Sequence, residues 1–174
     1  MSNEIKKATV QGIKYNGNVT LKWVKDNKVI KTKQIKNSPT SLLLRGISSF
    51  LLDYPTTNLI PRYLDVGKNN STNESTFNMV KLKETILNSR IILYRYAPQS
   101  IGESYTARFY TSIPSTATVP GQEIKEIGLF GTASGDSLLA RIIITDEEIS
   151  ENGSVTIPDG TVLFVEWDIS ISGV

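Results

Sequence analysis

The feature that most constrains the fold of this chain is an alternation of apolar and other residues near its end. Successive side chains of a β-strand point to opposite faces, so a period of two predicts a strand with one buried face. In Thr161–Ile171 the inward positions would be Leu163, Val165, Trp167, Ile169 and Ile171. The other face would hold Phe164, Glu166, Asp168 and Ser170. Phe164 is the apolar exception on that face, so we place it at an interface with a partner.

A second segment predicts a β-hairpin. Residues 123–144 read EIKEIGLFGTASGDSLLARIII, in which two apolar runs flank the turn Gly131–Ser137. Glycine tolerates positive φ, and Asp, Ser and Thr hydrogen-bond to nearby backbone, so this composition suits a turn. No residue at its tip is chemically reactive, and we expect the hairpin to have a structural role.

The remaining strand signals predict an all-β domain. Turns at Asn16-Gly-Asn18 and Asp26-Asn-Lys28 are expected to separate three early strands at about 4–13, 19–25 and 29–35. Residues 68–78 predict an exposed loop, and 81–87 suits either a strand or a helical turn. Further strands are expected at 60–67, 89–97, 103–113 and 154–157. Roughly eight or nine strands at this spacing are typical of an antiparallel β-sandwich or flattened barrel.

One helix is predicted, at about residues 39–52. Ser38 suits the N-cap and Pro39 the first helical position. One face then carries apolar residues at helical spacing: Leu43, Ile47, Phe50 and Leu51. A helix with one apolar stripe, set between β-rich segments, is expected to pack against a sheet.

The charge of the chain is divided between its two ends, although the formal net charge is only +2. Residues 1–36 carry nine lysines and two acidic residues, a net +7. Residues 136–174 carry eight acidic residues and one arginine, a net −7. We expect residues 1–36 to form a lysine-rich β-hairpin extension that packs on or projects from a β-sandwich assembly domain at 37–174.

Opposite charge at the two ends has two interpretations, and the sequence leaves both open. Each end could attract the oppositely charged end of a neighbouring copy. Salt screens this attraction beyond roughly 10 Å. Alternatively, they could lie side by side in one fold and pair with each other. The residues expected at a partner interface are Lys22, Lys25, Lys31, Lys33, Asp146, Glu147, Glu148 and Phe164.

The chain contains no Cys and no His. Disulfides, thiolate metal sites and catalytic groups of the Ser-His-Asp and Cys-His type are therefore excluded. Carboxylate-pair and Ser-Lys chemistry stay open. However, the nearest carboxylate groups, Glu123/Glu126 and Glu147/Glu148/Glu151, are better explained as solvated charge. We expect no enzymatic activity, no cofactor and no metal.

The sequence favours neither a membrane nor a nucleic acid as partner. No apolar run approaches the roughly 20 residues that span a bilayer, and the N-terminus lacks the apolar region of a signal peptide. We therefore expect folding in a cytoplasm. The basic segment could contact phosphates, with Tyr15 and Trp23 for stacking, but lysines without arginine read bases poorly. A protein partner is the better expectation.

Five segments, in order along the chain, share the pattern of one family. They are Leu42–Leu52, Pro61-Arg-Tyr-Leu-Asp-Val-Gly67, Leu87-Asn-Ser-Arg-Ile91, Glu126-Ile-Gly-Leu-Phe130 with Leu138-Leu-Ala-Arg141, and 158–171. Together they cover about residues 40–171 and resemble virion structural proteins of tailed bacteriophages. Two features depart from that pattern: Gly67-Lys-Asn-Asn70 replaces a glycine- and threonine-rich run, and the lysine-rich start lies outside it.

The resemblance implies a β-sandwich without catalytic residues, because the shared positions determine the fold. It implies a virion protein, assembled in the bacterial host cytoplasm, that self-associates and docks to neighbouring tail, collar or baseplate proteins. A head accessory or head-fibre anchor protein is an alternative. A carbohydrate-binding module on a phage fibre is another, with Trp23, Tyr105 and Tyr110 as candidate residues.

Overall fold

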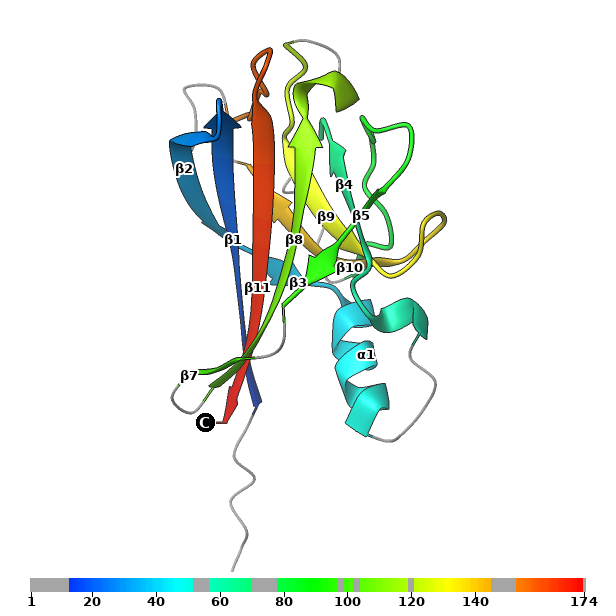
Figure 1. Ribbon diagram of the computed structural model, residues 1–174. Helices are drawn as coiled ribbons and strands as arrows, with labels where there is room; N and C mark the ends of the chain where they lie inside the picture. The colour runs from blue at the N-terminus through cyan, green and yellow to red at the C-terminus, as the bar shows by residue number, and fades with distance from the viewer. Residues whose placement is uncertain are drawn as a thin grey trace, which may run out of the picture.

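The computed structural model describes residues 13–51, 57–69, 78–96, 99–101, 104–118, 121–144 and 153–173. Two antiparallel β-sheets pack face to face, and helix α1 (Ser41–Leu51) lies at one end of the molecule (Figure 1). The predicted fold class, an all-β sandwich with a helix at about 39–52, is confirmed.

The large sheet, within the described residues, has six strands in the order β2-β1-β11-β8-β6, with β7 also paired to β8. They are β1 (Ile13–Lys25), β2 (Lys28–Lys36), β6 (Tyr94–Arg95), β7 (Gln99–Ile101), β8 (Ser104–Pro114) and β11 (Val162–Gly173). The alternating segment forms β11, between β1 and β8. As predicted, Leu163, Val165, Trp167 and Ile169 are buried.

The small sheet, counted over the same ranges, has five strands in the order β3-β10-β9-β4-β5. They are β3 (Ser38–Pro39), β4 (Tyr63–Gly67), β5 (Ile91–Ile92), β9 (Glu126–Phe130) and β10 (Leu138–Ile143). The predicted hairpin is confirmed as β9 and β10, with a register shift between Leu138 and Ala140. Short 3-10 turns occur at Thr57–Leu59 and Ser115–Ala117.

The core lies between the two sheets, where the inward residues of both meet. The large sheet contributes Val19, Leu21, Trp23, Phe109, Ile113, Leu163, Val165 and Trp167. The small sheet contributes Leu64, Val66, Ile127, Leu129, Ala140 and Ile142. Burial of apolar surface at about 25 cal/mol per Å² makes this layer the main source of folding free energy.

The lysine-rich segment, from residue 13 onward, is built into the large sheet. β1 pairs with β11 from Ile13 to Val24 and with β2 on its other side. The turn predicted between them is confirmed, since Asp26 and Asn27 have φ of 50° and 60° and join β1 to β2. Because β1 supplies core residues, residues 13–36 share one core with the rest of the described chain.

The turn predicted at Asn16-Gly-Asn18 is wrong, because β1 runs through it. A Cβ on Gly17 would overlap the side chain of Asn37. The Asn37 amide, in the orientation that suits its neighbours, donates to the Gly17 carbonyl (2.9 Å) and accepts from Trp167 Nε1 (3.1 Å) and the Tyr15 hydroxyl (2.7 Å). Glycine is therefore needed here for the close approach of a side chain within a strand.

The predicted start of the helix is also wrong. Ser38 and Pro39 pair with β10 as β3, so neither one caps or begins the helix. Thr40 takes the N-cap: its hydroxyl accepts from the Leu43 N–H (3.4 Å) and lies 2.8 Å from the carbonyls of Leu138 and Leu139. Strand pairing with β10 takes precedence over the local preference of Ser-Pro for a helix start.

The strand predicted at 89–97 is divided between the two sheets. β5 pairs with β4 in the small sheet, whereas β6 pairs with β8 in the large sheet. Leu93 lies between them and is buried in the core, where the chain crosses over. The segments at 81–87 and 154–157 form bends with the isolated bridges Gly67 to Thr85 and Ile124 to Val155.

Candidate assembly surfaces

The outer face of the small sheet is covered by residues 78–90 and holds a buried ion pair. Arg141 Nε and Nη2 each lie 2.7 Å from Glu126 Oε2, and the two side chains are 1% and 0% exposed. Nη1 donates to Met79 Sδ, and Nη2 also donates to the Asn69 carbonyl, each at 3.3 Å. Because buried charges need partners, this pair ties β9 and β10 to the covering segment.

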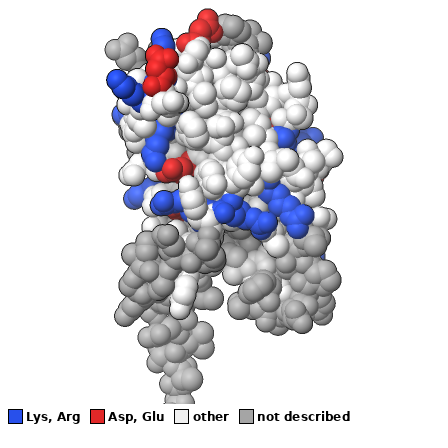
Figure 2. Space-filling model, viewed as in Figure 1, with Lys and Arg blue, Asp and Glu red and all other residues white. Residues whose placement is uncertain are grey.

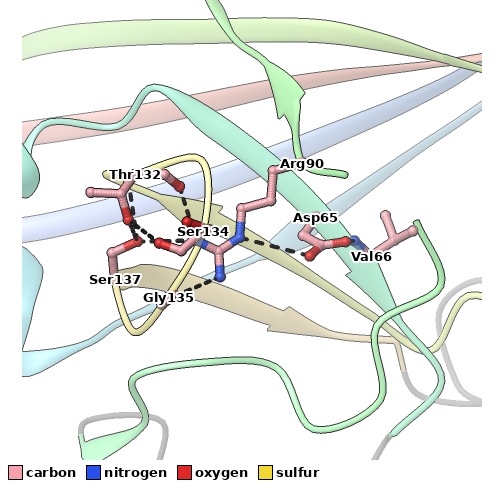
Figure 3. A network of polar contacts seen from close by, with 7 residues as sticks. All are labelled: Asp65, Val66, Arg90, Thr132, Ser134, Gly135 and Ser137. Carbon is pink, nitrogen blue, oxygen red and sulfur yellow. Dashed lines mark hydrogen bonds and ion pairs between the residues drawn. The ribbon is translucent and has the colours of Figure 1, made fainter. Parts of the chain in front are cut away.

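A second arginine, Arg90, holds the turn of the hairpin (Figure 3). It lies over the Phe130 ring, with Cζ 3.6 Å from the ring centre, and its Nε is 3.8 Å from Asp65 Oδ2 on β4. The guanidinium donates to three acceptors of the turn: Thr132 O (2.9 Å), Ser137 Oγ (3.2 Å) and Gly135 O (2.7 Å). Arg90 therefore fixes the turn 131–137 relative to β4.

Gly128, in the middle of β9, allows the covering layer to approach the sheet. A Cβ at this position would lie 2.6 Å from Leu138 Cδ1 and 3.1 Å from Leu82 Cδ2. The first of these distances is shorter than side chains tolerate. A larger residue at position 128 would therefore have to displace the Leu138 side chain.

Burial changes the ionisation of this layer. It raises the pKa of Asp65 to about 6, although the Val66 N–H and Arg90 oppose the rise. It also raises the pKa of Glu126, against the opposing effect of Arg141. Burial lowers the pKa of Arg90. Each buried carboxyl group faces an arginine, so the layer is a set of charge pairs inside the packing of the fold.

The carboxylates that the sequence singled out for catalysis take separate partners. Glu126 contacts Arg141, whereas Glu123 Oε2 lies 3.3 Å from Lys125 Nζ. Glu147, Glu148 and Glu151 fall outside the described residues, as does Asp146. In the part of the chain that is described, no group of three or more acidic side chains is placed to hold a metal ion.

Two of the predicted interface residues, Lys22 and Phe164, meet on the outer face of the large sheet. They are register partners on β1 and β11, and Lys22 Nζ lies 2.8 Å from Glu166 Oε2. They line a hollow of about 570 Å³ with Glu166, Val24, Asp26, Asn27, Val29, Gly160 and Val162. The ion pair joins a basic strand to an acidic one, which supports the interpretation that the charged ends lie side by side in one fold.

Lys31 and Lys33 point to the opposite side of the hairpin. They lie opposite Trp23 and Leu21, which face the core, and Lys31 Nζ is 4.9 Å from the centre of the Trp23 ring. Lys25 is the last residue of β1 and is exposed. β2 is an edge strand within the described residues, and inward lysines discourage another strand from pairing there. The predicted lysines thus lie on two faces of the hairpin.

The tyrosine cluster, Tyr94, Tyr96 and Tyr110, lies on the outer face of the large sheet. The Tyr96 ring stacks on Tyr110 with centroids 4.5 Å apart, and the Tyr94 ring lies 5.5 Å from Tyr110. Tyr94 is 61% exposed and Tyr96 is 51% exposed. Beside them, Arg108 Nε and Nη2 donate to Asp168 Oδ1 (2.6 Å) and Oδ2 (2.7 Å).

One carbohydrate-binding candidate from the sequence is wrong. Trp23 is 4% exposed and donates from Nε1 to the Thr156 carbonyl (2.8 Å), so its ring belongs to the core. Tyr110 belongs to the tyrosine cluster. Tyr105 is 68% exposed, but it is five positions from Tyr110 along β8 and therefore points to the other face.

Figure 2 shows the side on which the large sheet lies in front. Lys and Arg side chains lie along one margin and in a band across the lower part of the described surface, with acidic residues between them at several points. Uncharged residues cover most of the remaining area. This side is therefore of mixed charge, with a large uncharged area.

Sequence reasoning missed Tyr94, Tyr96 and the role of Arg90. The spacing of two in Tyr94-Arg-Tyr96 was a usable signal, because it puts both rings on one face of a strand. No local signal connects them to Tyr110, which reaches them only through the pairing of β6 with β8.

Comparison with known proteins leaves the family of the chain open. No family model, curated protein or solved structure matches it. No helix in the described ranges is long and apolar enough to cross a membrane.

Proposed function

We propose that this chain is a non-enzymatic structural subunit of a tailed-bacteriophage virion. It self-associates and docks to neighbouring tail, collar or baseplate proteins. One observation carries the proposal: three separated segments of the family pattern contact one another in the buried layer on the small sheet. Asp65 of the segment 61–67 faces Arg90 of the segment 87–91, and the Arg90 guanidinium lies over the Phe130 ring of the hairpin.

Contact among these segments supports the resemblance because short chance matches have no reason to be neighbours in space. Buried charges also depend on one another, since removal of one partner leaves the other uncompensated. Arg90 of the LNSRI segment faces Asp65 of the segment 61–67, and Arg141 pairs with Glu126 across the two strands of the hairpin. These positions therefore support a common fold with the virion proteins.

Assembly in this proposal uses the exposed surfaces of the large sheet. The edge strand β2 carries Lys28, Lys33 and Lys36, and its positive charge suits an acidic surface on a neighbouring copy or partner. Phe164, 38% exposed beside the hollow, offers an apolar contact. Lysine against lysine would oppose direct pairing of two β2 edges, so the contact would join unlike surfaces.

Mass spectrometry of purified virions tests the proposal. The chain is expected in intact particles at a constant ratio to the major structural proteins. Separated tails and heads then decide between the tail, collar or baseplate placement and the alternative of a head accessory or head-fibre anchor protein. Consistent absence from purified particles would overturn the proposal.

Light scattering of the purified protein tests self-association. We expect an oligomer at low salt that dissociates near 1 M salt, where charges are screened beyond about 3 Å. The double variant Lys33→Glu/Lys36→Glu should weaken it, whereas the matched control Lys81→Glu/Lys125→Glu, away from the β2 edge, should not. A monomer at every salt concentration would contradict self-association.

A further inference from the structure

We propose that the tyrosine cluster, together with Arg108 and Asp168, binds a neutral glycan. The sugar rings would stack on the exposed faces of Tyr94 and Tyr96, and their hydroxyl groups would bond to the charged pair. This binding activity is separate from the assembly role and does not depend on it.

The rings are suitably fixed and exposed. Each of Tyr94 and Tyr96 contacts Tyr110, yet more than half of its surface is open to solvent. The face of an aromatic ring is electron-rich and attracts the weakly positive C–H groups that cover one face of a pyranose. Because Tyr110 holds the rings in place, little conformational freedom is lost on binding.

The polar groups that a sugar needs lie next to the rings. Arg108 is two positions from Tyr110, on the same face of β8, and its carbonyl accepts from the Tyr96 N–H (3.1 Å). The two hydrogen bonds to Asp168 fix the orientation of the Arg108 guanidinium. The pair keeps further N–H donors and carboxylate lone pairs for neighbouring hydroxyl groups.

The charge of this face matches a neutral ligand. The charges on the same face as the cluster include two pairs that join neighbouring strands, Arg108 with Asp168 and Lys22 with Glu166, whereas Arg95 is the register partner of the buried Phe109 and belongs to the other face of β6. A polyanion such as nucleic acid gains most of its affinity from unmatched cations on the protein. These paired charges therefore favour a ligand that offers hydroxyl groups over one that offers phosphates.

The kind of apolar surface favours a glycan over a protein partner. A stable protein interface buries about 800 Å² on each side, with an apolar core inside a polar rim. Here the apolar contribution is a group of tyrosine rings, and Phe164, another exposed aromatic residue of the outer face, lines the hollow beside the β1–β2 hairpin. Exposed aliphatic side chains lie on β5, the β1–β2 hairpin, α1 and the covering segment: Ile92, Val29, Ile30, Leu44 and Val80.

Affinity electrophoresis in native gels tests the proposal, with hydroxyethyl cellulose, dextran and galactomannan as neutral probes. At least one should retard the full chain, and Tyr96→Ala should weaken that binding about tenfold. Tyr96→Trp keeps a ring and should retain binding. Tyr105→Ala is the matched control, an exposed tyrosine on the other face of β8, and should bind like the parent.

Three outcomes overturn the proposal: no retardation by any probe, equal retardation of parent and Tyr96→Ala, or equal losses in Tyr96→Ala and Tyr105→Ala. Thermal unfolding of each variant verifies that loss of binding is not loss of fold. If Tyr96→Ala changes only the oligomer seen by light scattering, the cluster is a protein interface and the glycan proposal fails. None of these results depends on whether the chain is found in virions.

Discussion

The outer faces of the two sheets carry the same kind of interaction in opposite surroundings. On the small sheet, Glu126 and Arg141 form an ion pair that is almost completely buried, whereas on the large sheet the side chains of Arg108 and Asp168 are 43% and 26% exposed. The distances between their charged atoms are similar, 2.7 Å and 2.6 Å. The distances alone therefore do not show which ion pair contributes more to the stability of the fold.

Burial makes the difference. A buried charge that loses its partner cannot recover its hydration, so each half of the inner pair depends on the other. An exposed pair exchanges its contact for water at little cost, typically 0–1 kcal/mol. The covered pair is therefore tied to the stability of the fold, whereas the exposed pair is open to solvent.

The largest effect is expected for Arg141→Met. This change leaves Glu126 buried without its cation and should lower the free energy of unfolding by roughly 3–5 kcal/mol. Urea unfolding followed by circular dichroism measures it. The double variant Glu126→Leu/Arg141→Met removes both charges and should recover much of the loss. If Arg141→Met were as stable as the parent, the buried ion pair would contribute no more to stability than the exposed one, and the difference between the two faces would be refuted.

Arg90→Met should have the next largest effect. It removes the hydrogen bonds to Thr132, Ser137 and Gly135 and the cation facing Asp65, a loss of about 2–3 kcal/mol. Arg90→Lys is the control, because it keeps the charge and loses the planar fork. Urea unfolding curves should show that the free energy of unfolding falls in the order parent, Arg90→Lys, Arg90→Met. If Lys matched the parent, charge alone would explain the role of Arg90.

Asp65→Asn should change how stability depends on pH. The pKa of Asp65 is about 6 in the folded protein against an ordinary 3.8, so the folded state binds its proton more tightly. The contribution of Asp65 is therefore fully present below about pH 4 and is lost as pH rises through about 6, by at most about 1.4 kcal/mol per unit. The stability gap between the parent and Asp65→Asn should change across this window.

Urea unfolding at a series of pH values measures that gap. The charge of Glu126 is one of the causes that raise the pKa of Asp65, so the change in the gap includes the interaction between these two carboxyl groups. A gap that stayed constant from pH 4 to pH 6.5 would show that Asp65 does not titrate in this range.

The smallest effect is expected for Arg108→Gln on the exposed face. Loss of its pair with Asp168 should cost about 0.2–1 kcal/mol, and less at high salt. Thermal unfolding at low and high salt measures it. A loss comparable to that of Arg141→Met would contradict the comparison of the two faces.

Local pattern was enough to predict the strands whose alternation is clean. The inward residues of β11, such as Val165 and Trp167, are buried, and β9 and β10 form the expected hairpin. Such patterns succeed because a period of two is a direct consequence of strand geometry. The prediction of one continuous strand at 89–97 is wrong, because the chain crosses from one sheet to the other at the buried Leu93. A local alternation of residues does not indicate such a crossing.

The sequence by itself determined the fold class, the turns at Asp26-Asn27 and 131–137, and the absence of Cys and His chemistry, since these depend on composition and neighbouring residues. Only the tertiary structure decided that Trp23 is in the core and that Gly17 leaves room for the Asn37 side chain. It also decided that Tyr94 and Tyr96 contact Tyr110 on an exposed face. The physical reason is that burial and contact depend on which distant strands pair. Two lysines of one hairpin, or two tyrosines of one sheet, acquire different roles when the second sheet covers one face and leaves the other open.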